Sequence, residues 1–300
     1  MRRFMKWAGL GLAILLLGVA GLFAVAWGVT GKAMSRKYAV NDPPLRIGTD
    51  VAALQRGKHL FDTRGCGDCH GPQGAGRVLI DDPILGRIVP PNLTRSLRNP
   101  AYTDDALAAA IRHGVRPEGT SLLLMPSGEF ANLDDADTAA LVAYMRSLPP
   151  SDNDPGTSTI RPMGRVLYTL GKLPLLPAET IDHAPRPRQA PAAAVTPDYG
   201  RYVAQSCTGC HAPDLAGGIV VIPGKPMSAN LTPHPNGLAK WSEADFLRLM
   251  HTGHRPDGTA VDPLMPWAVY NNMNETELRA VWAYLRTVEP SPGRGKVAQR

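Results

Sequence analysis

Two stretches of the chain decide its fold: Cys66-Gly67-Asp68-Cys69-His70 and Cys207-Thr208-Gly209-Cys210-His211. Together they contain all 4 cysteines of the 300 residues. A CxxC pair followed directly by His is the attachment signature of c-type haem. Two thiols add to the two vinyl groups of the porphyrin, and the adjacent imidazole is brought beneath the iron as its proximal ligand. We therefore predict two covalently bound haem c groups, held by Cys66, Cys69, Cys207 and Cys210, with His70 and His211 as iron ligands.

Two other interpretations of the cysteines are a zinc site and a redox-active dithiol. Zinc ribbons place their two CxxC pairs much closer together than the 141 residues that separate these pairs. Neither alternative requires a histidine after both pairs. The haem interpretation is favoured for these reasons.

The chain after its N-terminal part is one unit used twice, as a search for internal repeats shows. The offsets between matching motifs lie between 138 and 141 residues, so only small loop changes separate the copies. The matching pairs are Cys66 and Cys207, Asn92-Leu93-Thr94 and Asn230-Leu231-Thr232, Gly114–Gly119 and Gly253–Gly258, Met125-Pro126 and Met265-Pro266, and Tyr144 and Tyr284.

Each copy is predicted to begin with a short helix and to end with a capped one. The first helix carries Gly57 in one copy and Gly200 in the other. The N-terminus of each last helix is marked by a capping residue followed three positions later by an acid, Asp134 with Asp137 and Asn274 with Glu277. Apolar residues at helical spacing follow both pairs, so these helices are expected to pack in the core of their copy.

A second axial ligand is needed in most electron-carrying c-type cytochromes, and Met/His ligation raises the reduction potential. Met125 and Met265 lie 55 and 54 residues after their histidines, match in the repeat, and are both followed by Pro. Proline stiffens the loop that presents the sulfur to the iron. We predict that Met125 and Met265 are the distal iron ligands. Core packing is the alternative role of a methionine, and the weaker ligand candidates are Met145, Met163, Met227, Met250 and Met273.

Other duplicated residues have two open interpretations. The Asn-Leu-Thr motifs resemble glycosylation acceptors, but their duplication after the haem motif favours hydrogen bonding in a loop near the haem. Four further side chains either donate to haem propionates or serve the core and turns, namely Tyr102, Arg116, Trp241 and Arg255.

The N-terminus carries the net charge of +6, because the chain beyond residue 37 has 26 basic and 26 acidic side chains. No charged residue occurs from Trp7 to Gly31, a length that spans a bilayer as a helix. The basic flanks are an orientation signal for a membrane segment, and no nucleic-acid partner is predicted. A retained anchor is favoured over a signal peptide cleaved after Ala24-Val25-Ala26, since the apolar run continues past that site. With either outcome the rest of the chain is exported.

The predicted organisation is all-α, with two tandem domains behind an N-terminal transmembrane helix. The proposed segments are an anchor with basic flanks (1–37), a linker (38–49), a first domain (50–150), a proline-rich connector (151–195), a second domain (196–290) and a basic tail (291–300).

Residues 50–290 resemble the cytochrome c subunits of membrane-bound alcohol and sugar-acid dehydrogenases. The resemblance rests on CxxCH, Asn-Leu-Thr, Trp241-Ser-Glu-Ala-Asp-Phe, Met-Pro and the terminal Tyr-Leu-Arg helix. It implies class I cytochrome c folds, the cysteine, histidine and methionine roles given above, and no catalytic residue. Those subunits often carry three haems and a C-terminal membrane attachment, whereas this chain has two motifs and an N-terminal apolar segment. Dihaem cytochrome subunits of haem-copper oxidases share this two-motif pattern, and they remain an alternative.

The expected function is therefore one-electron transfer on the periplasmic side of a bacterial inner membrane. The donor would be a dehydrogenase subunit or a quinol, and the acceptor an oxidase or a soluble cytochrome. The rival is a redox enzyme, either a dihaem peroxidase or a thiosulfate-oxidising protein. Such enzymes need an open sixth coordination site or a Cys or Lys ligand, but haem attachment uses all four cysteines here.

Overall fold

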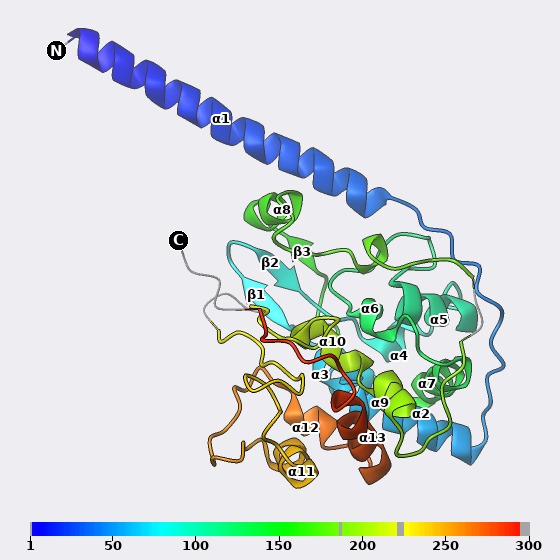
Figure 1. Ribbon diagram of the computed structural model, residues 1–300. Helices are drawn as coiled ribbons and strands as arrows, with labels where there is room; N and C mark the ends of the chain where they lie inside the picture. Colours follow the sequence, from blue (N-terminus) through cyan, green and yellow to red (C-terminus); the bar gives the residue numbers. More distant parts are fainter. Residues whose placement is uncertain (1, 186–187, 221–224, 295–300) are drawn as a thin grey trace. The chain divides into compact units, whose positions relative to one another are not determined.

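The structure is a computed structural model that describes residues 2–185, 188–220 and 225–294 (Figure 1). It is mainly helical, as predicted. The helices are α1 (Arg2–Ser35), α2 (Val51–Thr63), α3 (Cys66–His70), α4 (Leu93–Ser96), α5 (Asp104–His113), α6 (Ser127–Phe130), α7 (Asp135–Ser147), α8 (Pro162–Thr169), α9 (Pro197–Val203), α10 (Gln205–His211), α11 (Glu243–Thr252), α12 (Trp267–Tyr270) and α13 (Glu275–Leu285). Short 3₁₀ turns cover Pro72–Gly74 and Pro177–Glu179.

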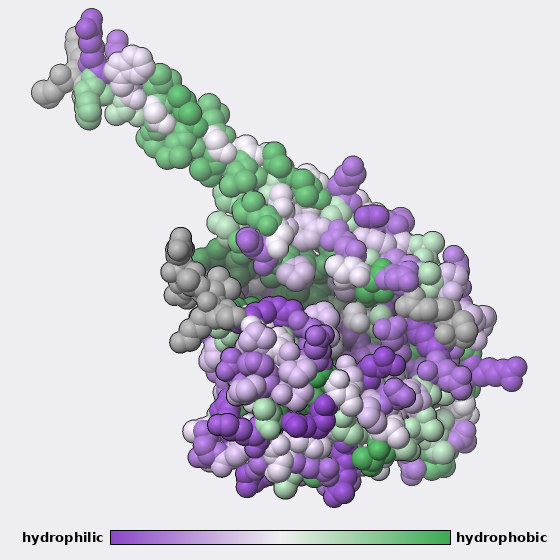
Figure 2. All heavy atoms as spheres, viewed as in Figure 1, coloured by the Kyte–Doolittle hydropathy of each residue, from purple (hydrophilic) through white to green (hydrophobic). Residues whose placement is uncertain are grey.

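Helix α1 contains the whole uncharged run of the N-terminus. From Arg3 to Ser35 it is long and apolar enough to cross a membrane, and Figure 2 shows apolar side chains along most of its surface. Its last turns differ from the rest of the helix. Ala26 and Thr30 are fully buried, because α8 packs against α1 there.

The first and last helices of each repeat cross at a glycine. A β-carbon at Gly57 of α2 would lie 2.0 Å from the carbonyl oxygen of Ala140 in α7, and one at Gly200 of α9 would lie 1.8 Å from that of Ala280 in α13. No side chain fits at either crossing. The two helix pairs therefore approach to backbone contact, and Phe61 packs edge-on against Tyr144 beside the first crossing, with ring centroids 5.5 Å apart.

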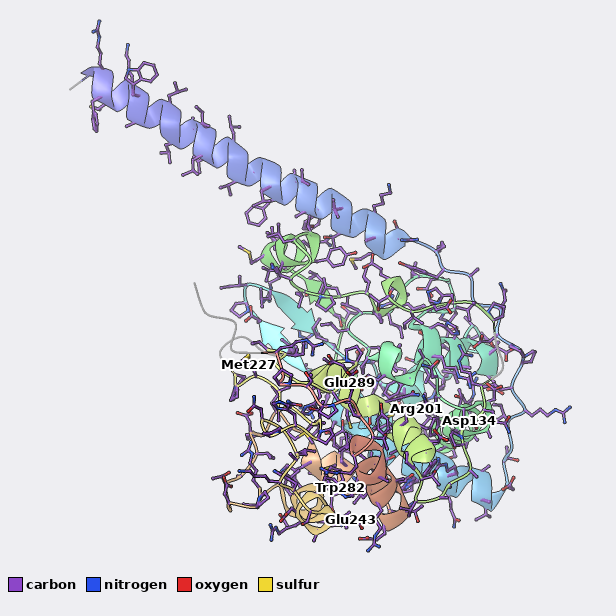
Figure 3. All side chains as sticks on the ribbon, in the orientation of Figure 1. Asp134, Arg201, Met227, Glu243, Trp282 and Glu289 are labelled. Carbon is purple, nitrogen blue, oxygen red and sulfur yellow. The ribbon has the colours of Figure 1, made fainter. Side chains whose placement is uncertain are left out.

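The predicted N-terminal caps are confirmed. The Asp134 side chain accepts hydrogen bonds from the amides of Ala136 and Asp137, and Asn274 with Glu277 forms a complete capping box. In the second repeat α13 also contacts α11. Trp282, labelled in Figure 3 together with Glu243 at the start of α11, stacks on Phe246 with ring centroids 5.6 Å apart.

A small antiparallel sheet adds to the helices and was missing from the all-helical prediction. Its strands are β1 (Ile80–Asp82), β2 (Gly86–Ile88) and β3 (Thr159–Ile160), in that order. β3 belongs to the connector, which continues into α8 and then buries Leu175 and Leu176 with Ile88 and Ile160. The first part of the connector thus packs against the first repeat through these apolar side chains.

By packing, the chain divides into two compact units. The first consists of residues 1–41, 69–125 and 149–184, and the second of residues 42–68, 126–148 and 185–300. The second unit contains α2 and α7 of the first repeat together with the second repeat. The domain boundaries taken from the sequence repeat stay a prediction, and positions 186–187 of the connector and 295–300 of the tail lie outside the described residues.

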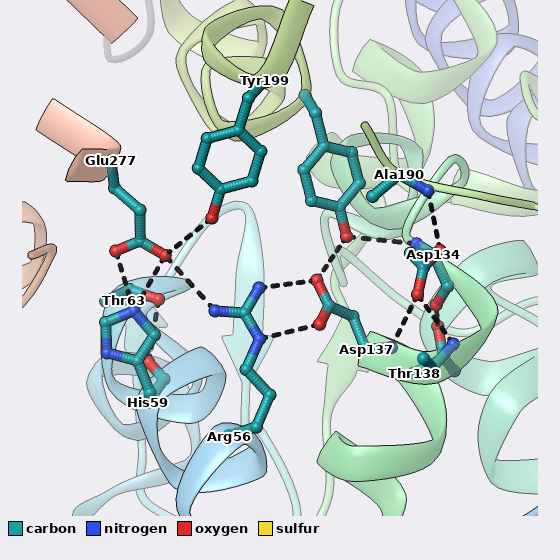
Figure 4. A network of polar contacts seen from close by, with 11 residues as sticks. Arg56, His59, Thr63, Asp134, Asp137, Thr138, Ala190, Tyr199 and Glu277 are labelled. Carbon is teal, nitrogen blue, oxygen red and sulfur yellow. Dashed lines mark hydrogen bonds and ion pairs between the residues drawn. The ribbon is translucent and has the colours of Figure 1, made fainter. Parts of the chain in front are cut away.

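Within the second unit, Arg56 links the two repeats (Figure 4). Its guanidinium makes two hydrogen bonds of 2.8 Å to the Asp137 carboxylate, one to each oxygen. On its other side it lies 3.4 Å from a carboxylate oxygen of Glu277. Arg56 comes from α2 and Asp137 from α7, whereas Glu277 belongs to α13 of the other repeat. A bidentate contact of this kind fixes both the position and the orientation of the guanidinium relative to the carboxylate.

Each of the two acids also receives a proton donor from the opposite repeat. The Tyr202 hydroxyl donates to Asp137 over 2.6 Å, and His59 Nε2 lies 2.7 Å from a Glu277 oxygen. Asp137 and Glu277 occupy matching positions in the two last helices. The network is therefore pseudo-symmetric, although His59 and Tyr202 are different residue types.

Opposing effects act on the two carboxyl groups. Burial raises the pKa of Asp137, but the hydrogen bonds and charge of Arg56 outweigh it and hold that pKa below its ordinary value. Burial likewise raises the pKa of Glu277, and His59 and Arg56 bring it below its ordinary value. Both groups are thus carboxylates at neutral pH, and their ionisation stabilises the folded protein.

Asp137→Asn is expected to lower the free energy of unfolding at pH 7 by about 1.5–3 kcal/mol, the range for a hydrogen bond to a charged group. A folded-state pKa below the unfolded one gives stability that is present above the unfolded value of about 3.9 and is lost as the pH falls through the folded value. Urea unfolding of the variant, followed by circular dichroism, is therefore expected to show a shallower loss of stability than wild type below about pH 5.

The matched control is Asp198→Asn on α9, where the side chain is 80% exposed and 3.9 Å from Arg201. This exposed pair is expected to contribute less than about 1 kcal/mol. Equal pH profiles for the two variants would contradict the assigned role of Asp137.

Candidate haem attachment sites

The first CxxCH motif forms helix α3 by itself. Gly65 connects α2 to α3 with a φ of 69°, in the left-handed region where glycine is favoured. The short helix places Cys66, Cys69 and His70 at the spacing of one helical turn. In the second motif no such glycine is needed, since α10 follows α9 through Ala204 with ordinary right-handed geometry.

Both histidines of the motifs are held in the same tautomer. His70 Nδ1 lies 3.0 Å from the carbonyl oxygen of Pro91, and His211 Nδ1 lies 2.7 Å from that of Ala229. A carbonyl can only accept, so Nδ1 carries the proton in each ring. Nε2 is then left with its lone pair, which is the form that binds a metal.

Burial keeps these two imidazoles neutral. It lowers the pKa of His70, against the smaller opposing effect of the hydrogen bond to Pro91. The pKa of His211 is lowered in the same way, with Ala229 as the opposing partner. Both rings are therefore suited to donate a lone pair to iron at neutral pH.

The duplicated Asn-Leu-Thr motif holds the carbonyl groups that accept these hydrogen bonds. Pro91 directly precedes Asn92, and Ala229 directly precedes Asn230. The Asn92 amide donates to the carbonyl oxygen of Ser151 over 2.9 Å, and the Asn230 amide donates to that of Ser291 over 2.7 Å.

The threonine of each motif completes the same arrangement. Thr94 Oγ1 accepts from the backbone amide of Ser151 over 3.0 Å, and Thr232 Oγ1 accepts from that of Ser291 over 3.1 Å. The motif thus joins the loop beneath each histidine to the chain that follows the last helix of the repeat. The predicted role in loop hydrogen bonding is confirmed, and Asn92 is 4% exposed, so it has no room for a glycan.

Burial disfavours the thiolate form of the cysteines in the second motif. Burial raises the pKa of the Cys207 thiol to about 12 and that of Cys210 above its ordinary value. Reactive CxxC pairs have lowered thiol pKa values instead. Within the described part of the chain, no group of three or more His, Cys, Asp or Glu side chains is arranged to hold a metal ion. The raised thiol pKa values argue against a redox dithiol at the second motif.

The two predicted methionine ligands lie in matching places at the start of a short helix. Met125-Pro126 leads into α6, and Met265-Pro266 leads into α12. Both methionine side chains are partly exposed. Three of the weaker candidates are core residues with exposures of only 5–6%, namely Met145, Met250 and Met273. Met227, labelled in Figure 3, lies in the loop that precedes Asn230.

The helix that follows each Met-Pro pair packs on the haem-attachment region of the other repeat. α6 contacts α10, and Glu129 of α6 lies against Gly209, where a β-carbon would be 2.0 Å from its carboxylate. α12 contacts α2, and Val269 lies beside Gly65. Burial raises the pKa of Glu129 to about 7, opposed by the charge of Arg64. The only sequence signal for this contact is a weak one, a glycine between the two cysteines of the second motif.

Arg116 and Arg255, which match in the repeat, stabilise the turns in which they lie. Arg116 donates to the carbonyl oxygen of Ser121, and Arg255 donates to that of Ala260 over 2.6 Å. These contacts agree with the turn-stabilising alternative for both residues. The residues of both sites fit a c-type haem, because each motif pairs two cysteines on one helix with an imidazole whose Nε2 is deprotonated.

Comparison with known proteins agrees with this geometry. The sequence pattern of the cytochrome c family matches residues 54–149 and again residues 198–289. A dihaem cytochrome c-type protein of Cereibacter sphaeroides is 28% identical, over 96% of this chain and 99% of that protein.

Two longer relatives are dehydrogenase subunits. A subunit of the nicotinate dehydrogenase of Pseudomonas putida is 25% identical over 91% of this chain but only 25% of its own length. The cytochrome c subunit of a quinone-dependent alcohol dehydrogenase of Komagataeibacter europaeus is 28% identical over 81% of this chain and 57% of its own length. The chain spans a quarter to just over half of these two relatives. From its two motifs, its two fixed imidazoles and its two matched regions, the chain belongs to the cytochrome c family.

Proposed function

We propose that the protein is a membrane-anchored dihaem cytochrome c that carries electrons from a dehydrogenase or quinol donor to a respiratory acceptor. One observation carries the proposal furthest. Each CxxCH histidine donates through Nδ1 to a backbone carbonyl that directly precedes Asn-Leu-Thr. The same histidine geometry is thus built twice, from residues that are 21 positions apart in the first repeat and 18 in the second.

The residues of each site would together bind one haem. Cys66 and Cys69, or Cys207 and Cys210, would attach it covalently, and His70 or His211 would bind the iron through Nε2. The bound haem supplies a one-electron couple between ferric and ferrous iron. Met125 and Met265 would supply the sixth ligand, and thioether sulfur favours the ferrous state. The protein sets the potential and the docking surfaces and needs no catalytic side chain.

Helix α1 is the proposed anchor in the bacterial inner membrane. Its tryptophans at positions 7 and 27 are 20 residues apart, which corresponds to about 30 Å of helix, the thickness of the hydrocarbon core. Tryptophan favours the two membrane interfaces. Haem is attached to CxxCH motifs outside the cytoplasm, so the haem domains would lie on the periplasmic side.

The proposed donor is a dehydrogenase subunit, as the names of the longer relatives suggest. An oxidase or a soluble cytochrome would then accept the electrons. Capture of the tagged full-length chain in mild detergent, followed by mass spectrometry, is expected to recover a dehydrogenase subunit in near-stoichiometric amount. Addition of the substrate of that subunit is expected to reduce the haem. Recovery of oxidase subunits alone would favour the dihaem oxidase alternative.

The haem content tests the basis of the proposal. The purified protein is expected to carry two haems that resist acid-acetone extraction, because thioether bonds survive that treatment. Cys69→Ala is expected to disrupt the first site and leave one extraction-resistant haem at the second, as measured by the pyridine haemochrome assay. One haem in the wild type, or extractable haem, would refute the dihaem assignment.

The methionine assignment has its own spectroscopic test. Oxidised wild-type protein is expected to show the weak near-infrared sulfur-to-iron band from both haems. Met125→Ala is expected to remove about half of that band and to lower the potential of the first haem, because a thioether ligand raises it. Met265→Ala is expected to have the same effect on the second haem.

A matched control is Met273→Leu, which changes a methionine that is 6% exposed in the core. This variant is expected to keep the full band. A full band in Met125→Ala or Met265→Ala would show that another side chain is the ligand. Rapid carbon monoxide binding by wild type would instead indicate an open site and favour the enzyme alternative.

A further inference from the structure

Helix α8 of the connector lies directly against the end of α1. It buries Ala26 and Thr30 of α1 completely, and the Arg165 guanidinium stands over the Trp27 ring, 3.9 Å from its centroid. Figure 1 shows α8 beside the C-terminal part of α1. Both helices belong to the same compact unit.

The position of Trp27 gives the depth of α8. If α1 spans the membrane as proposed, Trp7 and Trp27 mark the two interfaces, since about 30 Å of helix separates them. The side chain of Arg165 touches Trp27. Helix α8 therefore lies at the level of the periplasmic membrane interface.

One face of α8 is apolar and largely exposed at that level. Met163, Leu167 and Leu170 follow one another at intervals of four and three residues, so they share a face. Met163 is 37% exposed and Leu170 is 58% exposed, and Leu167 between them is half-buried. An apolar stripe on a short surface helix is typical of a helix that lies in a membrane interface.

The turn between β1 and β2 adds a further exposed apolar side chain next to α8. It packs on α8 so closely that a β-carbon at Gly164 would lie 2.2 Å from the carbonyl oxygen of Leu85. The neighbouring Ile84 at the same turn is 61% exposed. We name the side chains of Ile84, Met163, Leu167 and Leu170 the α8 patch.

Basic side chains accompany the α8 patch. Arg161 and Arg165 lie at the start of and within α8, and the exposed Lys172 follows its end. Three acids lie nearby: Asp81, 3.8 Å from Arg161 and 3.5 Å from Arg87, Asp82, which accepts from the amide of Ile84, and Glu179, which accepts from the hydroxyl of Tyr168 in α8. Basic side chains beside exposed apolar groups match the anionic headgroups and acyl chains of a lipid surface.

We propose that the α8 patch inserts into the outer surface of the bilayer that α1 crosses. This inference rests on the proposed anchor role of α1. The bilayer is favoured over a protein partner because the patch is continuous with a helix already assigned to the membrane. The first compact unit would then be held to the membrane at two places, and His70, which lies in this unit, would keep a fixed orientation toward the membrane.

The haem chemistry of the chain makes a thiol test possible. If haem occupies all four native cysteines, an introduced cysteine is the one thiol open to reagent. Leu170→Cys and Ile84→Cys each place that thiol in the α8 patch. Val195→Cys, at a position 52% exposed outside α1, α8 and the hairpin, is the matched control.

The full-length holoprotein is reconstituted alone in nanodiscs that contain anionic lipid, and the rate of reaction with a membrane-impermeant maleimide is measured. A thiol in lipid is shielded and ionises poorly, so the two patch variants are expected to react at least about tenfold more slowly than Val195→Cys. An unchanged haem spectrum confirms that each variant is folded.

Three outcomes would overturn the proposal or its basis. Equal rates at all three positions would show that the patch faces water. Protection in native membranes but not in nanodiscs of the purified protein would identify the patch as a surface for a protein partner. A fourth variant, Leu12→Cys in the middle of α1, tests the anchor role of α1 separately from the insertion of the α8 patch. Rapid labelling of this cysteine would refute the anchor itself.

Discussion

The hydrogen bond from His211 Nδ1 to the carbonyl oxygen of Ala229, with its equivalent from His70 to Pro91, is the constraint on which both sites depend. An imidazole binds iron only through a deprotonated nitrogen, so the other nitrogen needs a permanent acceptor. The acceptor here is a loop carbonyl, which by itself has no fixed position. The Asn and Thr side chains of the following motif fix the position of this carbonyl, because they hydrogen-bond the loop to the end of each repeat.

The contact between the repeats follows a second principle, the matching of buried charges. Arg56 would be costly to bury alone, and so would Asp137 and Glu277. Together with His59 and Tyr202 they satisfy one another across the second unit. Because the last helices of both repeats carry an acid at the same position, one arginine can serve both. The helix crossings at Gly57 and Gly200 keep those acids in register.

Sequence reasoning recovered the parts of the structure that repeat or that follow local rules. The helices that carry Gly57 and Gly200, the caps at Asp134 and Asn274 and the apolar N-terminal helix all have signals within a few residues. The sheet was missed because its strands are only two or three residues long and the last comes from the connector. His59 was assigned no partner, since Glu277 lies 218 residues away and no repeat position marks it. The acceptors Pro91 and Ala229 were missed because a backbone carbonyl has no residue-type signature. The roles of the cysteines, histidines and methionines toward haem stay predictions.

The contact of Glu129 with Gly209 has a consequence for how the protein is made. Gly209 stands between the two thiols of the second motif, and α6 of the first repeat lies against that turn. An apparatus that joins haem to Cys207 and Cys210 has to reach this turn from outside. If haem is attached to Cys207 and Cys210 as proposed, its attachment would have to precede the docking of α6 on α10, and association of the repeats would come second. A chain that folded early would then close its own second motif before the cofactor arrived.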